Sequence, residues 1–181
     1  MVAGRTKMKG FIQQMGLMFL CLACLSLVLS QKVFAVPGIS TDDLVKSSEV
    51  IVVGKVEKAS CHWTKGTVVT RATVKVNEVL AGNIDKKDII VEYEGGKVGD
   101  LELKLSDAVS LTKGEEIILF LKTGQSKLDG TVFVIEGAAQ GKYTIKNGIA
   151  SKNGFTCEKN MDIVDNNIPV KELVAKIKTN Q

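Results

Sequence analysis

Between residues 50 and 151 the chain consists of short segments that are either apolar or alternate between apolar and polar residues, and no helical repeat separates them. Alternation places successive side chains on opposite faces of a strand, with a period of two residues. Strands that follow one another through short turns, without strand–helix–strand units, are typical of a sandwich or a barrel. We therefore predict a mainly β, antiparallel barrel or sandwich of about seven or eight strands.

The same pattern locates the individual strands. Gly54, inside the first of them, predicts a bulge or a sharp bend. Residues 116–122 are apolar at nearly every position, which predicts a central strand covered on both faces. Asn147-Gly148 predicts a tight hairpin turn, because both positions accept positive φ. The predicted strands are 50–58, 67–79, 88–94, an edge strand in the alternating segment 101–105, 116–122, 131–136, 142–145 and 149–151.

Two helices flank the strands. Ser40 is a suitable N-cap for a short helix with Asp42 and Asp43 in its first turn, ending near residues 47–48. Pro169 opens the second helix, over residues 170–178. Its apolar stripe consists of Val170, Leu173, Val174 and Ile177.

Residues 1–35 form a separate region. Three basic residues precede the apolar segment 15–29, and Val33-Phe34-Ala35 ends this region in a small residue. A basic start, an apolar core and a small residue at the cut describe a secretory signal peptide. We predict a signal peptide over 1–35, a single domain over 36–181, and export to the periplasm or out of the cell.

Three other interpretations of this region stay open. An uncleaved membrane anchor needs about 20 apolar residues, and Gln13 and Gln14 interrupt the longer stretch. A lipoprotein signal would attach lipid at Cys24, although apolar residues continue beyond it. A prepilin leader would be cut after Gly10, but Met15 stands where that family normally has glutamate.

The formal net charge of +4 belongs to the same region. Removing its four basic residues from the total of 24 leaves 20 basic residues against 20 acidic ones. Binding of nucleic acid wants a basic surface interleaved with aromatic side chains, and only six aromatic residues follow residue 35. We expect no nucleic-acid partner, and no membrane contact after cleavage of the signal peptide.

Cys61 and Cys157 are the only cysteines after residue 35. Paired cysteines of exported proteins usually form disulfides, so we predict a Cys61–Cys157 bridge. Two alternatives stay open: a metal site made from both cysteines and His62, and a Cys–His nucleophile. After residue 35 the C-x-x-C or H-x-x-x-H spacing typical of zinc is missing, and we expect neither a metal nor another cofactor.

Catalytic motifs are also missing, and we assign no catalytic residue. His62 is the only histidine, and no G-x-S-x-G, P-loop or H-E-x-x-H motif occurs. Carboxylate neighbours at 42–43, 92/94 and 115–116 leave open a hydrolase that uses paired carboxylates. Trp63 and His62 fall in a predicted loop over residues 61–66, where an aromatic side chain can anchor a partner. The alternative for Trp63 is packing over the predicted disulfide.

Several segments resemble, in the same order, a secreted bacterial domain family of unknown function. Leu44 to Val56 resembles its opening helix and strand, and residues 74–82 resemble its second strand and turn. Residues 91–99, 111–121 and 140–143 resemble later elements. The first strand is also similar to that of netrin-like/metalloproteinase-inhibitor modules, which implies an OB-like barrel. Those inhibitors chelate zinc with an N-terminal cysteine, whereas cleavage here would leave Val36 first.

From these observations we expect an exported, non-catalytic binding or interaction module, monomeric, whose partner is an extracytoplasmic protein or glycan. Two alternatives stay open. One is a small extracytoplasmic hydrolase that uses carboxylates, and the other is an envelope structural protein tethered by an uncleaved N-terminal helix.

Overall fold

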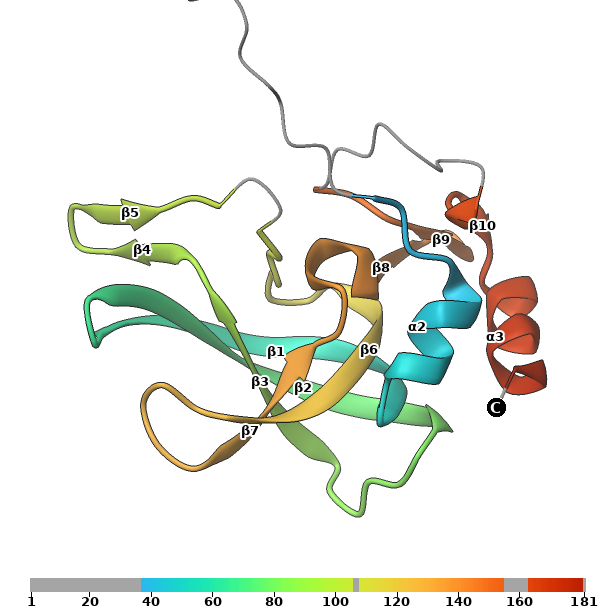
Figure 1. Ribbon diagram of the computed structural model, residues 1–181, viewed down its shortest axis with the longest axis horizontal. Coiled ribbons are helices and arrows are strands. Elements are labelled where there is room, and N and C mark those ends of the chain that lie inside the picture. The colour runs from blue at the N-terminus through green and yellow to red at the C-terminus, as the bar shows by residue number, and fades with distance from the viewer. Residues whose placement is uncertain (1–36, 106–107, 155–162, 181) are drawn as a thin grey trace, which may run out of the picture. The chain divides into compact units, whose positions relative to one another are not determined.

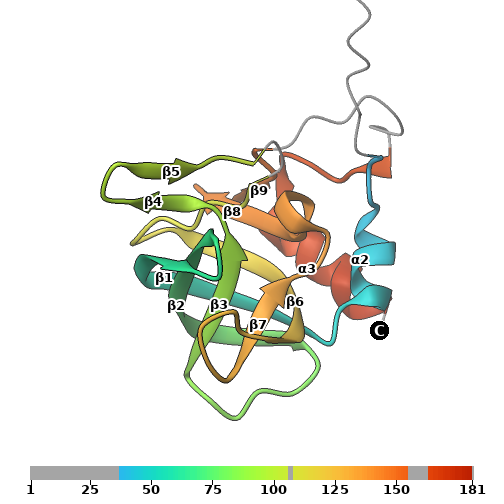
Figure 2. The same ribbon diagram turned by 60° about the vertical axis from the view of Figure 1, so that its left-hand side comes forward.

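Five strands of the computed structural model pair in a closed circuit, which organises the fold (Figures 1 and 2). The circuit runs from β1 (Val50–Thr64) through β2 (Thr67–Ala81), β3 (Asp88–Glu94), β7 (Thr131–Ile135) and β6 (Glu116–Gln125) back to β1. Its pairings are antiparallel except the one between β3 and β7, which is parallel. This confirms the predicted mainly β class, and the circuit is compatible with a barrel.

The structure describes residues 37–105, 108–154 and 163–180. The predicted signal peptide and Cys157 lie outside these residues. Three strands extend the sheet beyond β6, and two form a small separate sheet. The first group is β8 (Lys142–Lys146), β9 (Ile149–Ser151) and β10 (Ile168–Pro169), and the second is β4 (Gly96–Val98) and β5 (Leu101–Leu103). The helical elements are α2 (Thr41–Ser47), the 3-10 turn η1 (Ala138–Gly141) and α3 (Val170–Thr179).

The β1–β2 hairpin is longer than the sequence pattern predicts. Its turn is Lys65-Gly66, with φ of 48° and 80°, and β1 continues to Thr64. The predicted loop over residues 61–66 is therefore wrong: Cys61, His62 and Trp63 are paired with β2. The sequence of these residues does not alternate between apolar and polar side chains. They are in a strand because they pair with β2, whose sequence does alternate.

Gly54 marks the irregularity predicted for β1. The pairing register of β1 and β2 shifts between Val53 and Gly54. A Cβ atom at Gly54 would lie 2.7 Å from the backbone oxygen of Lys75, which is too close for a side chain. Glycine is needed here because the two backbones approach so closely.

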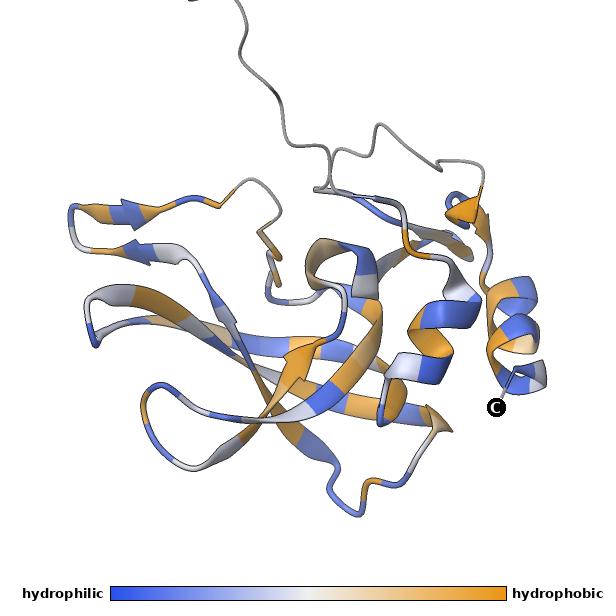
Figure 3. Cartoon of the chain, viewed as in Figure 1, coloured by the Kyte–Doolittle hydropathy of each residue, from blue (hydrophilic) through white to orange (hydrophobic). Residues whose placement is uncertain are grey.

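Two apolar clusters hold the fold together, and β1 and β6 contribute to both. Val52, Leu119 and Leu121 belong to the cluster shared with β2 and β3, whereas Ile51 and Phe120 belong to the cluster that contains the helices. Adjacent residues of these strands therefore point into different clusters, because side chains alternate along a strand. This explains why residues 116–122 are almost uniformly apolar, as Figure 3 shows along β6.

Helices α2 and α3 lie side by side at one end of the unit formed by residues 35–181 (Figures 1 and 2). The backbone amide of Asp43 donates to Ser40 Oγ over 3.1 Å, which confirms the predicted N-cap. On α3, Leu173 and Ile177 are fully buried in the second cluster. No helix among the described residues is both long and apolar enough to cross a membrane.

Candidate functional site

The predicted contact residues lie near the tip of the β1–β2 hairpin. Trp63 is 54% exposed, and His62 is exposed with its Nε2 atom 3.1 Å from Ser60 Oγ. Trp63 pairs with Val68 and His62 with Val69, so they belong to opposite faces of the hairpin. The structure therefore exposes both residues without bringing their side chains together.

Cys61 is half-buried on the same face as Trp63. Its sulfur lies 3.3 Å from Thr70 Oγ1, and within the described part of the chain it is a free thiol. Because Cys157 lies outside that part, the Cys61–Cys157 bridge stays a prediction.

A network of charged residues joins the hairpin to the loop between β6 and β7. The Glu92 carboxylate on β3 accepts from Arg71 Nε over 2.9 Å, from Ser126 Oγ over 2.5 Å and from the Lys127 amide over 2.8 Å. Arg71 also pairs with Asp129 over 2.8 Å. This network was not predicted from the sequence, because nothing in the pattern indicates that a loop some 30 residues beyond Glu92 folds back onto it.

The environment of Glu92 favours its charged form. The carboxylate is 6% exposed, and burial alone would raise its pKa. The hydrogen bonds from Ser126 and Lys127 and the Arg71 guanidinium outweigh burial, so the pKa lies below its ordinary value. The loop is thereby fastened to the sheet by a buried, ionised group.

The same loop braces the hairpin tip directly. Thr64 Oγ1 donates to the backbone oxygen of Lys127 over 3.3 Å. The Lys127 side chain pairs with Glu94, whose exposed carboxylate shares the strand with Glu92. The exposed Trp63 is therefore one residue from a strand end that a neighbouring loop holds in place.

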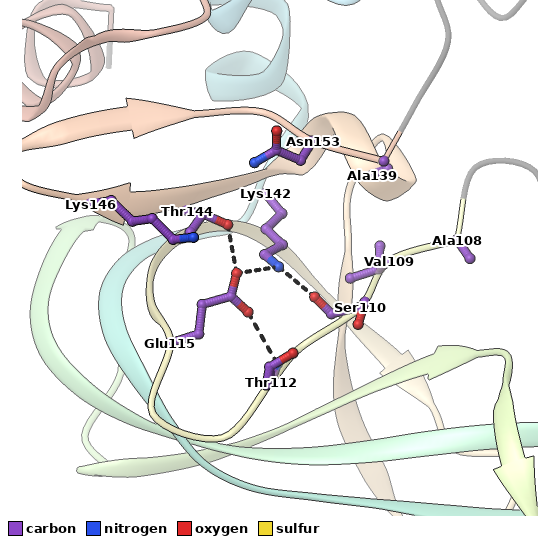
Figure 4. Close-up of a pocket in the computed structure, with 11 residues that line it drawn as sticks. Ala108, Val109, Ser110, Thr112, Glu115, Ala139, Lys142, Thr144, Lys146 and Asn153 are labelled. Carbon is purple, nitrogen blue, oxygen red and sulfur yellow. Dashed lines mark hydrogen bonds and ion pairs between the residues drawn. The ribbon is translucent and has the colours of Figure 1, made fainter.

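A second candidate is a polar cavity of about 230 Å³ between β8 and the segment before β6 (Figure 4). Glu115 accepts from Lys142 Nζ over 2.7 Å, from Thr144 Oγ1 over 2.6 Å and from the Thr112 amide over 3.1 Å. Lys142 also donates to the backbone oxygen of Ser110. Burial raises the pKa of Glu115, but Lys142 and Thr144 outweigh it, so the pKa is lowered.

A third candidate is a more apolar groove of about 430 Å³ between the β4–β5 hairpin and the inner face of β1 and β2. Cys61, Tyr93 and Leu103 are among its lining residues. Among the described residues, the groove has one carboxylate, Glu102, and the polar cavity also has one, Glu115. Within that part of the chain, neither space offers the two facing carboxylates that glycoside hydrolysis requires.

The remaining predicted carboxylate pairs are engaged elsewhere. Glu92 and Glu94 bind Arg71 and Lys127, and Asp43 accepts from Ser40 Oγ in the N-cap of α2. Among residues 37–105, 108–154 and 163–180, no three His, Cys, Asp or Glu side chains gather in a way that would hold a metal ion. Comparison with models of protein families, with curated proteins and with solved structures finds no match.

Proposed function

We propose that the protein is an exported, non-catalytic binding module that contacts a protein or glycan partner with the tip of the β1–β2 hairpin and the β6–β7 loop. We call this surface the hairpin-tip surface and define it by Trp63, Lys65, Lys127 and Asp129. The observation that carries the proposal is the 54% exposure of Trp63, the only tryptophan of the chain, at a braced strand end.

Two physical arguments support this surface. Tryptophan is enriched among the residues that dominate binding energy at interfaces. A rigid presentation lowers the entropy that is lost on binding, and here Thr64 and Glu92 fasten the hairpin and the loop. Lys127 and Asp129 belong to the loop that contacts Thr64 and Arg71, and their opposite charges favour a partner with mixed charge, as most protein surfaces have.

Fold analogy points to the same end of the molecule. OB barrels bind oligonucleotides and oligosaccharides with their second and third strands and with the loops after their first and fourth strands. The five strands of the circuit follow one another in the sequence as β1, β2, β3, β6 and β7, so the corresponding loops are β1–β2 and β6–β7. Because the chain after residue 35 has equal numbers of acidic and basic residues, this analogy favours a glycan over a nucleic acid.

The experiment is photocrosslinking in the native host with benzoylphenylalanine at position 63. The matched control carries the same group at Ile149, which is 37% exposed in the β8–β9 hairpin. We expect a covalent adduct from position 63 and none from 149, and its digestion with protease or glycosidase identifies the partner class. Equal adducts, or no adduct from position 63, would overturn the proposal.

Fluorescence gives an independent readout. Since Trp63 is the only tryptophan, its emission reports on this surface alone. We expect a blue shift when the identified partner is added, because binding removes the indole from water. An unchanged emission at saturating partner would contradict contact at Trp63.

A further inference from the structure

The outer edge of β5 carries an alternating segment that the proposed function does not use. Leu101 in β5 and Leu105, two residues beyond the end of β5, are 56% and 42% exposed. Figures 1 and 2 show β4 between β5 and the β1–β2 hairpin, so β5 has β4 on one side only. In the described part of the chain, β4 is the only strand paired with β5.

An unpaired strand edge presents backbone donors and acceptors to any second strand. The apolar residues of β5 share one face: Leu101 pairs with Val98 and Leu103 with Gly96 across the hairpin. Glu102 pairs with Lys97, which places Glu102 on the opposite face. The edge is therefore apolar on one face and charged on the other.

We propose that residues 101–105, which are β5 and the two residues after it, pair antiparallel with the same residues of a second copy of this chain, with Leu103 opposite the partner's Leu103 on the two-fold axis. In this register Glu102 lies opposite the partner's Lys104, and Lys104 lies opposite the partner's Glu102. Leu101 lies opposite the partner's Leu105. The two hairpins then form one four-stranded sheet through a contact that is identical from both copies, as two-fold symmetry requires.

Side-chain charge favours this register over other two-fold symmetric registers, which are centred on a different residue. Centring the pair on Glu102 would set that carboxylate against the partner's Glu102, and centring it on Lys104 would set two ammonium groups together. Like charges directly opposite one another destabilise a strand pair, whereas opposite charges stabilise it. Within one copy Lys104 and Glu102 already approach to 3.2 Å, and their side chains are 81% and 45% exposed, so both remain available to a partner.

The short edge implies a weak, concentration-dependent dimer. A segment of five residues buries much less than the roughly 1,200 Å² of a stable interface. The sequence alone predicts a monomer, and a measurement at high concentration distinguishes the monomer from the dimer. The dimer is independent of the hairpin-tip surface, since β5 contributes no residue to that surface.

The test is sedimentation velocity of the exported protein, produced from the full chain, from about 10 µM to 1 mM. We expect a dimer to form across this range. Glu102→Lys and Lys104→Glu each place like charges opposite one another, so each raises the dimer Kd by at least about tenfold. The double variant E102K/K104E restores opposite charges and restores the dimer.

Mixing the two single variants gives the decisive result. The lysine pair of E102K is complementary to the glutamate pair of K104E, so the mixture forms a heterodimer although each variant alone stays monomeric. Circular dichroism confirms that both variants are folded. We take about 1 mM as the upper limit of weak association, so a wild-type protein that is still monomeric at this concentration overturns the proposal. A dimer whose Kd is unchanged by these charge substitutions also overturns it.

Discussion

At the scale of single residues, Lys152 is the least compensated side chain in the described part of the chain. Its residue is 3% exposed, and its Nζ atom is buried without a hydrogen-bond partner. The ammonium lies 4.7 Å from the centre of the Tyr143 ring, which offers a cation–π contact. Burial lowers the pKa of Lys152 to about 8, helped by Lys176 and opposed by Asp165.

This lysine predicts a specific dependence of stability on pH. Between about pH 8 and its ordinary value of 10.5, the unfolded chain binds a proton that the folded chain has lost. The free energy of unfolding therefore rises with pH in this window. Lys152→Met abolishes that rise and increases stability at pH 7 by about 1–2 kcal/mol.

Urea denaturation from pH 7 to 10.5 measures this effect. Lys171→Met, at an exposed position of α3, is the matched control and leaves the slope unchanged. The same slope in the wild type and in Lys152→Met would show that the burial of Lys152 does not influence its titration.

Gly54 is the second residue with a sharp prediction. An alanine Cβ would meet the Lys75 backbone oxygen at 2.7 Å, and backbone moves only with the whole strand. We expect Gly54→Ala to lower the free energy of unfolding by about 2–4 kcal/mol. Gly124→Ala is the control, because the added Cβ would meet a Val134 side-chain methyl at 2.8 Å. That methyl can rotate away, so equal losses from both variants in thermal unfolding would contradict the argument.

At the scale of elements, the β6–β7 loop depends on one carboxylate. Glu92 accepts three hydrogen bonds from this loop and β2, and its pKa is lowered below 4.5. A group whose pKa is lower in the folded than in the unfolded state stabilises the protein at pH values above its unfolded-state pKa. This contribution is lost as the pH falls through the folded-state pKa. The loop should therefore loosen under acidic conditions.

Glu92→Gln tests this dependence. We expect a loss of about 1–3 kcal/mol at pH 7 and a flatter decline of stability below pH 4.5, since the substituted amide does not titrate. Hydrogen exchange of the Lys127 amide should accelerate, because that amide donates to Glu92. Glu94→Gln, which affects an exposed pair, should change stability by less than about 1 kcal/mol. Equal effects from the two variants would contradict the importance of burial.

At the scale of the whole molecule, the predicted bridge links residues 61 and 157, far apart in the chain. The chain-entropy model gives a loop of this length roughly 4–5 kcal/mol of stabilisation. We expect the exported protein to show no alkylatable thiol before reduction and two after it, with a lower melting temperature once reduced. Cys61→Ser and Cys157→Ser should each resemble the reduced protein. Two reactive thiols in the untreated, denatured protein would disprove the bridge.

The sequence by itself determined the class of the fold and most element positions. The Asn147-Gly148 turn signal identified β8 and β9, and the apolar stripe of α3 placed Leu173 and Ile177 in the core, because both signals depend only on residues a few positions apart in the chain. The end of β1 escaped prediction, since Cys61, His62 and Trp63 have no apolar alternation and take their conformation from pairing with β2.

The tertiary structure alone decided what surrounds the candidate site. It brought Ser126 and Lys127 onto Glu92 and closed β6 against β1, and among the described residues it gave β5 no strand partner other than β4. Such contacts join residues far apart in the chain, and their partners are chosen by packing and charge in three dimensions rather than by local pattern. Local propensity therefore indicates the strands, while their closure into a circuit brings the β6–β7 loop against Thr64, the residue after Trp63.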